Sequence, residues 1–144
     1  MIDLHTHILP GIDDGSPNAG TSMRMLRQMA VQGTQILCAS PHYYADEQSI
    51  HEFCEKRDVA FAEFRQAGLG EYEDQPIVLP AAEVAFFPCI SVEKELERLC
   101  IKGTHTLLLE MPFCEWNDFQ IEEVTSLSLD LGYQIVLVHP ERFL

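Results

Sequence analysis

Basic residues are scarce in this chain. Its 144 residues include 9 lysines and arginines against 23 aspartates and glutamates, which gives a formal net charge of −14. Proteins that bind DNA or RNA usually carry a stripe of lysine and arginine along the phosphate backbone. We therefore expect no nucleic-acid partner, and we consider part of the excess carboxylate available for metal binding.

Long apolar runs are also missing. No segment approaches the ~20 consecutive apolar residues that a membrane-spanning helix needs. Met1 enters the first strand pattern directly and leaves no room for a signal sequence. The sequence therefore predicts a cytoplasmic protein without a membrane span.

Paired cysteines are absent as well. The cysteines are odd in number and form no C-x-x-C pair, so neither a disulfide framework nor a thiolate zinc site is indicated. They are Cys38, Cys54, Cys89, Cys100 and Cys114. A thiol-based tyrosine phosphatase needs C-x5-R, yet the residues six positions beyond these cysteines are Tyr44, Ala60, Glu95, Thr106 and Gln120. That class of phosphatase is excluded, and the cysteines are expected to be reduced and mostly buried.

What the chain does contain is a regular alternation of short apolar runs and amphipathic segments. The runs are rich in Val, Ile and Leu, as in parallel strands buried on both faces. Predicted strands cover Met1–His5, Gln35–Ala39, Ile77–Ala81, Thr106–Glu110 and Gln134–His139. Two predicted helices end at Gly33 and near Gly68. A third covers Ser91–Leu99, with Ser91 in a capping-box-like position, and a fourth covers Asp118–Leu131 and is closed by Gly132.

This order predicts an α/β fold with parallel strands and right-handed crossovers, either a barrel or an open doubly wound sheet. No repeat, low-complexity tract or linker divides the chain, so residues 1–144 are expected to form one domain. A complete (β/α) barrel typically needs ~250 residues. About five βα units therefore predict an incomplete barrel.

Histidine or glutamate stands at the end of every predicted strand. These residues are His5 and His7, His42, Glu83, Glu110 and His139, with Asp13 and Asp14 in the first loop. The carboxyl ends of parallel strands meet at the face where ligands bind. Imidazole and carboxylate ligands without thiolate suit Mn²⁺, Fe or Zn²⁺. The sequence thus predicts a cluster of two or three metal ions.

Such a cluster suits phosphate ester hydrolysis, because two metal ions lower the pKa of a bridging water and bind the oxygens of an in-line displacement. Arg142 could offer its guanidinium to the phosphate. Tyr43 and Tyr44 are either pocket residues for an aromatic leaving group or buried packing residues. His51 and His105 are expected at the surface or in packing.

The stretches DLHTHILPGIDDG, SPHYY, AAEV, LLLEMP and LVHPERF resemble consecutive motifs of the polymerase and histidinol phosphatase (PHP) superfamily. The resemblance is to its bacterial manganese-dependent protein-tyrosine-phosphatase branch and covers Ile2 to Phe143. It implies a distorted (β/α)7 barrel. It implies metal ligation by His5, His7, Asp14, His42, Glu83, Glu110 and His139, phosphate binding by Arg142, and a role for Asp13 beside the ligand position.

The resemblance also implies a function. Members of the branch dephosphorylate tyrosine residues, notably on bacterial tyrosine kinases of capsular and exopolysaccharide synthesis, and we expect a metal-bridged hydroxide as the nucleophile. Members continue well beyond HPER and supply a final Asp-x-His pair and another arginine, whereas this sequence stops at Leu144. An open parallel edge favours pairing with another chain or disorder of the end. The sequence is then either a fragment of a longer protein or a truncated product that forms a homo-oligomer.

Two other functions stay open at this point. A histidinol-phosphate-type phosphatase shares the metal ligands and differs mainly in the loops around its substrate. A non-catalytic, metal-binding remnant would bind metal without turnover. The acidic charge argues against a polymerase-associated exonuclease.

Overall fold

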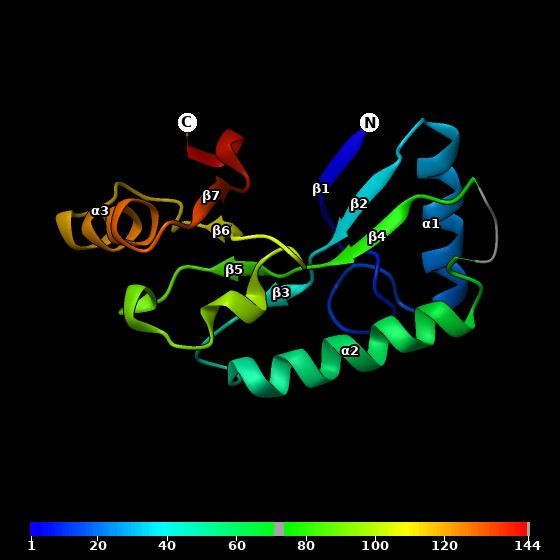
Figure 1. Cartoon of the computed structure of the whole chain (residues 1–144), viewed down its shortest axis with the longest axis horizontal. Helices are drawn as coiled ribbons and strands as arrows, with labels where there is room; N and C mark the ends of the chain where they lie inside the picture. Colours follow the sequence, from blue (N-terminus) through cyan, green and yellow to red (C-terminus); the bar gives the residue numbers. More distant parts are fainter. Residues whose placement is uncertain (71–73, 144) are drawn as a thin grey trace.

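The computed structural model describes residues 1–70 and 74–143, and it has the α/β organisation that the sequence predicts (Figure 1). All strand pairs in the described residues are parallel. The strands are β1 (Ile2–Thr6), β2 (Ile36–Ala39), β3 (His42–Tyr43), β4 (Ile77–Pro80), β5 (Glu83–Ala85), β6 (Thr106–Glu110) and β7 (Gln134–Leu137). The five predicted strands are therefore confirmed, with ends that differ by at most two residues.

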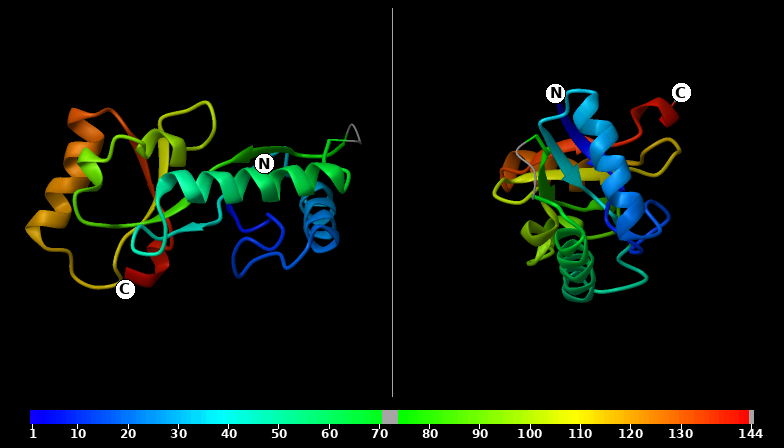
Figure 2. Two further views of the ribbon diagram at one scale, coloured as in Figure 1. Left: turned by 90° about the horizontal axis from the view of Figure 1, so that it is seen from below. Right: turned by 90° about the vertical axis from the view of Figure 1, so that its right-hand side faces the viewer.

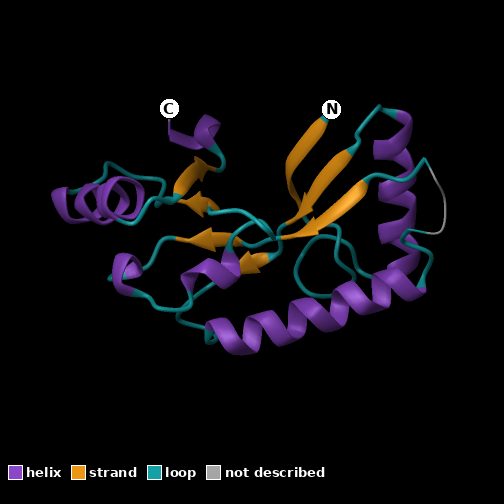
Figure 3. Ribbon diagram, in the orientation of Figure 1, coloured by secondary structure: helices purple, strands orange, loops and turns teal. Residues whose placement is uncertain are grey.

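The strands form two sheets that meet in the middle of the molecule (Figure 3). One sheet has the order β1-β2-β4 and the other has the order β3-β5-β6-β7. Only Ser40 and Pro41 separate β2 from β3, and only Ala81 and Ala82 separate β4 from β5. The short strands β3 and β5 were not predicted, and each continues the chain directly after a predicted strand. At the first junction Pro41 cannot donate a ladder hydrogen bond.

Three helices accompany the sheets: α1 (Ala19–Val31), α2 (Ile50–Gln66) and α3 (Asp118–Thr125). The helix α2 runs along one side of the molecule past both sheets (Figure 2). Its first half contributes Phe53 to a core cluster with Val84 and Leu107, and its second half contributes Phe64 to a cluster with Leu37. Burial of both rings fixes the two sheets against one helix.

The predicted helix over Ser91–Leu99 is wrong. This stretch forms two short 3-10 turns, η1 (Ile90–Val92) and η2 (Leu96–Leu99). Ser91 lies inside η1, whose N-cap is Cys89, and its backbone N–H donates to Glu123 Oε2 of α3 at 2.9 Å. Leu96 and Leu99 are both buried, and a spacing of three residues places them on one side of a 3-10 turn as well as of an α-helix.

The predicted helix over Asp118–Leu131 is confirmed with one difference. It is α-helical to Thr125 and continues as a π-helical segment, η3 (Ser126–Asp130). Gly132 follows with φ +75°, the left-handed conformation that glycine adopts readily after a helix. A last 3-10 turn, η4 (Pro140–Phe143), follows β7.

Within residues 1–70 and 74–143 the sheets stay open, and no closed barrel is formed. The strands β1 and β7 each pair on one side only. No helix of the described residues is long and apolar enough to cross a membrane. All five cysteines are free, and Cys38, Cys54 and Cys100 are buried, whereas Cys89 and Cys114 are exposed.

Candidate metal centre

The two histidines of the first strand reach the same place, as their spacing predicts. His5 lies in β1 and His7 follows it, and their Nε2 atoms are 3.3 Å apart. Alternate residues of an extended chain point to one face, which explains the approach. Both side chains are about three-quarters buried.

Glu83 is the centre of the cluster. It begins β5, and its carboxylate is completely buried. Four imidazoles surround it: His5 Nε2 at 2.9 Å, His7 Nε2 at 3.0 Å and His42 Nδ1 at 3.2 Å from Oε2, and His139 Nε2 at 3.0 Å from Oε1. The chain passes from β4 in one sheet to β5 in the other through Ala81 and Ala82, and Glu83 is the first residue of β5.

Asp13 and Asp14 occupy different positions. Asp13 is buried, and its Oδ2 accepts a hydrogen bond from His7 Nδ1 at 2.7 Å, on the side of the ring away from Glu83. Asp14 is 84 % exposed and lies 3.5 Å from His42 Nε2. Asp14 therefore faces the cluster, whereas Asp13 holds His7 in the tautomer that leaves Nε2 with a free lone pair.

Gly15 allows this loop to fold back onto His7. A Cβ atom at position 15 would lie 2.3 Å from His7 Cβ and 2.3 Å from His7 O, so no larger residue fits. The backbone N–H of Gly15 donates to Asp13 Oδ1 at 3.0 Å, and Ser16 N–H donates to His7 O at 3.0 Å. Sequence reasoning missed Gly15, because the close approach joins residues of a loop whose path no local pattern reveals.

His139 follows β7 in a strained conformation. Its φ of +53° is unusual for a residue with a side chain and indicates a local constraint. This backbone brings Nε2 to Glu83, while Nδ1 lies 3.3 Å from Glu141 Oε1. Glu141 therefore contacts Nδ1 of His139 as Asp13 contacts Nδ1 of His7, although the side chain of Glu141 is more exposed.

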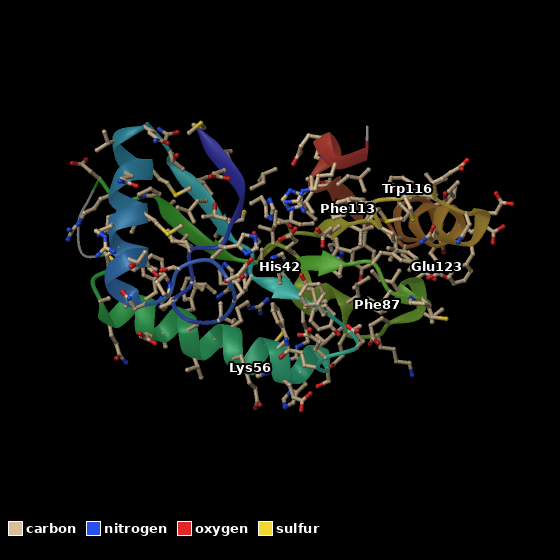
Figure 4. The ribbon with its side chains drawn as sticks, turned by 180° about the vertical axis from the view of Figure 1, so that it is seen from behind. His42, Lys56, Phe87, Phe113, Trp116 and Glu123 are labelled. Atoms are coloured by element: carbon tan, nitrogen blue, oxygen red, sulfur yellow. The ribbon has the colours of Figure 1, made fainter. Side chains whose placement is uncertain are left out.

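Glu110 and Arg142 complete the predicted set. Glu110 ends β6, and Arg142 lies in η4 with its Nη1 4.0 Å from Glu110 Oε1. Both line a cavity of about 570 Å³ together with His7, Asp14, Gly15, His42, Tyr44, Phe113 and His139. Figure 4 labels His42 and Phe113, which both line this cavity. Six of the predicted site residues therefore line one cavity: His7, Asp14, His42, Glu110, His139 and Arg142. His5 and Glu83 do not line it and lie next to each other beside His7.

The charges in the cluster shift the pKa values of three groups. Hydrogen bonds to Asp13 and Glu83 raise the pKa of His7 from 6.5 to about 10. Burial acts to raise the pKa of Glu83, but the side chains of His5 and His7 outweigh it and hold that pKa well below its usual range. Burial likewise opposes the hydrogen bonds that lower the pKa of Asp13. The carboxylates are therefore ionised at neutral pH.

The donor set fits divalent metal ions. Among the described residues, three groups bring ligand atoms within 4.8 Å of one another: His5, His7 and Glu83; His7, Asp14 and His42; and His42, Glu83 and Glu110. The oxygens of Glu83 and Nδ1 of His42 are buried, and within the described part of the chain none has a well-aligned hydrogen bond despite the short distances. Buried imidazole nitrogens and carboxylate oxygens that converge on one place are the ligand atoms that a divalent cation can bind.

The groups share His7, His42 and Glu83, which suits neighbouring ions better than a single one. His139 belongs to none of the three groups, although it touches Glu83. His51 and His105 lie outside the cluster with side chains that are each 62 % exposed. Their expected surface position is confirmed.

Comparison with known proteins agrees with this geometry. The tyrosine-protein phosphatase YwqE of Bacillus subtilis is 30 % identical over 151 residues, covering 99 % of this chain and 55 % of the relative. The CapC protein of Staphylococcus aureus is 26 % identical over 148 residues, covering 99 % of this chain and 54 % of the relative. The chain spans about half the length of these curated relatives.

A solved structure shares the fold. It comes from crystal structures of YwqE from Bacillus subtilis and CpsB from Streptococcus pneumoniae, described as unique metal-dependent tyrosine phosphatases. The match has a TM-score of 0.73 and 31 % sequence identity, and it covers 99 % of this chain and 56 % of the other. The family model for capsular polysaccharide synthesis proteins CpsB/CapC matches residues 1–144. The chain therefore belongs to the CpsB/CapC family of capsular polysaccharide synthesis.

Proposed function

We propose that this protein is a metal-dependent phosphatase that hydrolyses phosphotyrosine on proteins to tyrosine and inorganic phosphate. The observation that carries the proposal is the buried carboxylate of Glu83 among four imidazoles, beside a cavity that also contains Arg142. The relatives named as tyrosine phosphatases support the same reaction.

In this proposal the ligands are His5, His7, Asp14, His42, Glu83, Glu110 and His139. When bound, the metal ions would supply Lewis-acid stabilisation and a nucleophilic water at neutral pH. Asp13 fixes the ring of His7 and keeps its Nε2 directed inward. Arg142 donates N–H groups from its planar guanidinium to the oxygens of the phosphate.

The finer identity of the fold and cofactor belongs to the same proposal. We infer a single PHP domain over residues 1–144 with the strand arrangement of a distorted (β/α)7 barrel, and the parallel strands supporting one site at their carboxyl ends agree with it. The donor set suits Mn²⁺, with Fe or Zn²⁺ as alternatives, in two or three ions. A bacterial tyrosine kinase as partner, a cytoplasmic location and a homo-oligomer stay predictions.

Hydrolysis by purified protein tests the function. With added Mn²⁺ we expect hydrolysis of p-nitrophenyl phosphate and of a phosphotyrosyl peptide, and little hydrolysis of the matching phosphoseryl peptide. The His5→Ala, His7→Ala double variant should lose activity by about two orders of magnitude or more, because one metal group loses two of its three donors.

The matched control is the His51→Ala, His105→Ala double variant, which removes two exposed imidazoles and should retain activity. Preference for histidinol phosphate over the phosphotyrosyl peptide would favour the small-molecule phosphatase instead. A folded protein that binds Mn²⁺ and hydrolyses none of these substrates would be a non-catalytic metal-binding protein.

A further inference from the structure

Two aromatic side chains line the cavity beside the candidate metal ligands, and neither is itself a candidate ligand. Tyr44 comes directly after β3, and Phe113 lies in the loop between β6 and α3. Both belong to the cavity of about 570 Å³ that also contains His42 and Arg142. That size is within the roughly 300–1,000 Å³ of small-molecule sites.

The ring of Tyr44 is held against the metal cluster. It stacks on His42 with ring centroids 5.4 Å apart and an interplanar angle of 22°. Tyr44 therefore presents an aromatic ring next to a ligand group.

Phe113 lies beside the phosphate-binding candidate. The guanidinium carbon of Arg142 is 5.1 Å from the centre of the Phe113 ring, a cation–π distance. Phe113 is 48 % exposed, so its ring is accessible from the solvent. A ring that contacts Arg142 lies close to any group esterified to a phosphate that Arg142 binds.

We propose that Tyr44 and Phe113 form the walls that receive the aromatic ring of an aryl phosphate, so that the site selects aryl over alkyl phosphate esters. The proposal rests on the phosphatase function proposed above and names the residues that would set its substrate class. Offset or edge-to-face ring contacts favour aromatic groups, whereas an alkyl ester leaves these rings in contact with water.

Binding of two non-hydrolysable ligands tests the proposal without turnover. Phenylphosphonate and methylphosphonate share the same anionic head and differ in the ring. Their dissociation constants are measured by calorimetry on the Mn²⁺-loaded full chain. The parent should bind phenylphosphonate about tenfold more tightly, since a ring contact is worth a factor of roughly two to twelve.

Leucine substitutions remove the aromatic ring of Phe113 or Tyr44 but keep a large apolar side chain at the position. Phe113→Leu and Tyr44→Leu should each reduce the preference for phenylphosphonate by about threefold or more while methylphosphonate affinity stays within twofold. Tyr44→Phe keeps the ring and should keep the preference. Phe119→Leu, on α3 with 46 % exposure and outside the cavity, is the matched control and should behave as the parent does.

Three outcomes would overturn the proposal. One is a phenyl-to-methyl ratio that is unchanged in both leucine variants. Another is an equal loss for both phosphonates, which would mean that the rings only position Arg142 or the ligands. The last is no preference in the parent. If the parent shows the expected ratios but hydrolyses no aryl phosphate, the proposed function fails while the aryl-binding site stands.

Discussion

Replacing Asp13 by asparagine is the sharpest test of how the metal centre is organised. The substitution keeps the size of the side chain and removes one acceptor oxygen. Asp13 accepts three hydrogen bonds: Oδ2 from His7 Nδ1 at 2.7 Å and from His42 N–H at 3.2 Å, and Oδ1 from Gly15 N–H at 3.0 Å. An amide cannot satisfy all three donors, because one of its two atoms is itself a donor.

Either orientation of the amide has a cost. If the NH2 group faces His7, Nδ1 must accept and the ring proton moves to Nε2, the atom that points at Glu83 from 3.0 Å. A protonated Nε2 has no lone pair for a metal ion. If the carbonyl oxygen faces His7 instead, the NH2 group meets the Gly15 N–H and that hydrogen bond is lost.

We expect the Asp13→Asn variant to bind Mn²⁺ about 10–100-fold more weakly, which corresponds to about 1.4–2.7 kcal/mol. Calorimetric titration of the metal-free protein near neutral pH measures the affinity, and circular dichroism checks that the fold is retained. Asp58→Asn removes the same charge at a carboxylate that is 71 % exposed and serves as the control. The reasoning is refuted if Asp13→Asn binds Mn²⁺ as tightly as the parent, or if Asp58→Asn weakens binding equally.

Three further predictions concern other parts of the structure. Gly15→Ala should weaken Mn²⁺ binding and lower the free energy of unfolding by about 1–3 kcal/mol, because the new Cβ would lie 2.3 Å from His7. The control is Gly20→Ala, whose Cβ meets only Asn18 Oδ1 at 3.3 Å and which should change neither quantity. Equal losses in the two variants would contradict the prediction. In metal-free protein, the raised pKa of His7 contributes stability that is complete below 6.5 and is lost as the pH rises toward about 10. The melting temperature in EDTA should therefore fall over that range and fall less with Mn²⁺ bound, whereas a rise in EDTA would count against it. Ser49→Ala should lower the free energy of unfolding, measured with denaturant, by about 1 kcal/mol, because Ser49 and Glu52 form a capping box at the start of α2. Ser91→Ala removes no cap and should change the free energy of unfolding by less than half as much.

Local patterns of the sequence determined much of this protein. Runs such as Gln134–His139 and Thr106–Glu110 are apolar between polar ends, a pattern typical of parallel strands. The structure buries Leu107, Leu108 and Leu109 of β6, whereas Leu137 of β7 is 37 % exposed. Parallel strands bring their carboxyl ends together, so a histidine or glutamate at each end predicts one cluster without any coordinates. The loop glycine at Gly132 and the capping residues of α2 are equally local signals.

The tertiary structure decided what depends on contacts between distant segments. Ser91 has the spacing of a helix cap, yet its N–H bonds to Glu123, and two 3-10 turns form instead. The sequence places Asp13 and Asp14 side by side, and only the path of the loop over His7 separates the orienting carboxylate from the one that faces the cavity. The contact of Phe113 with Arg142 likewise joins the loop after β6 to the turn η4. The reason is physical: periodicity and strand ends follow from neighbouring residues, whereas close approach, ring orientation and burial depend on where the chain returns in space.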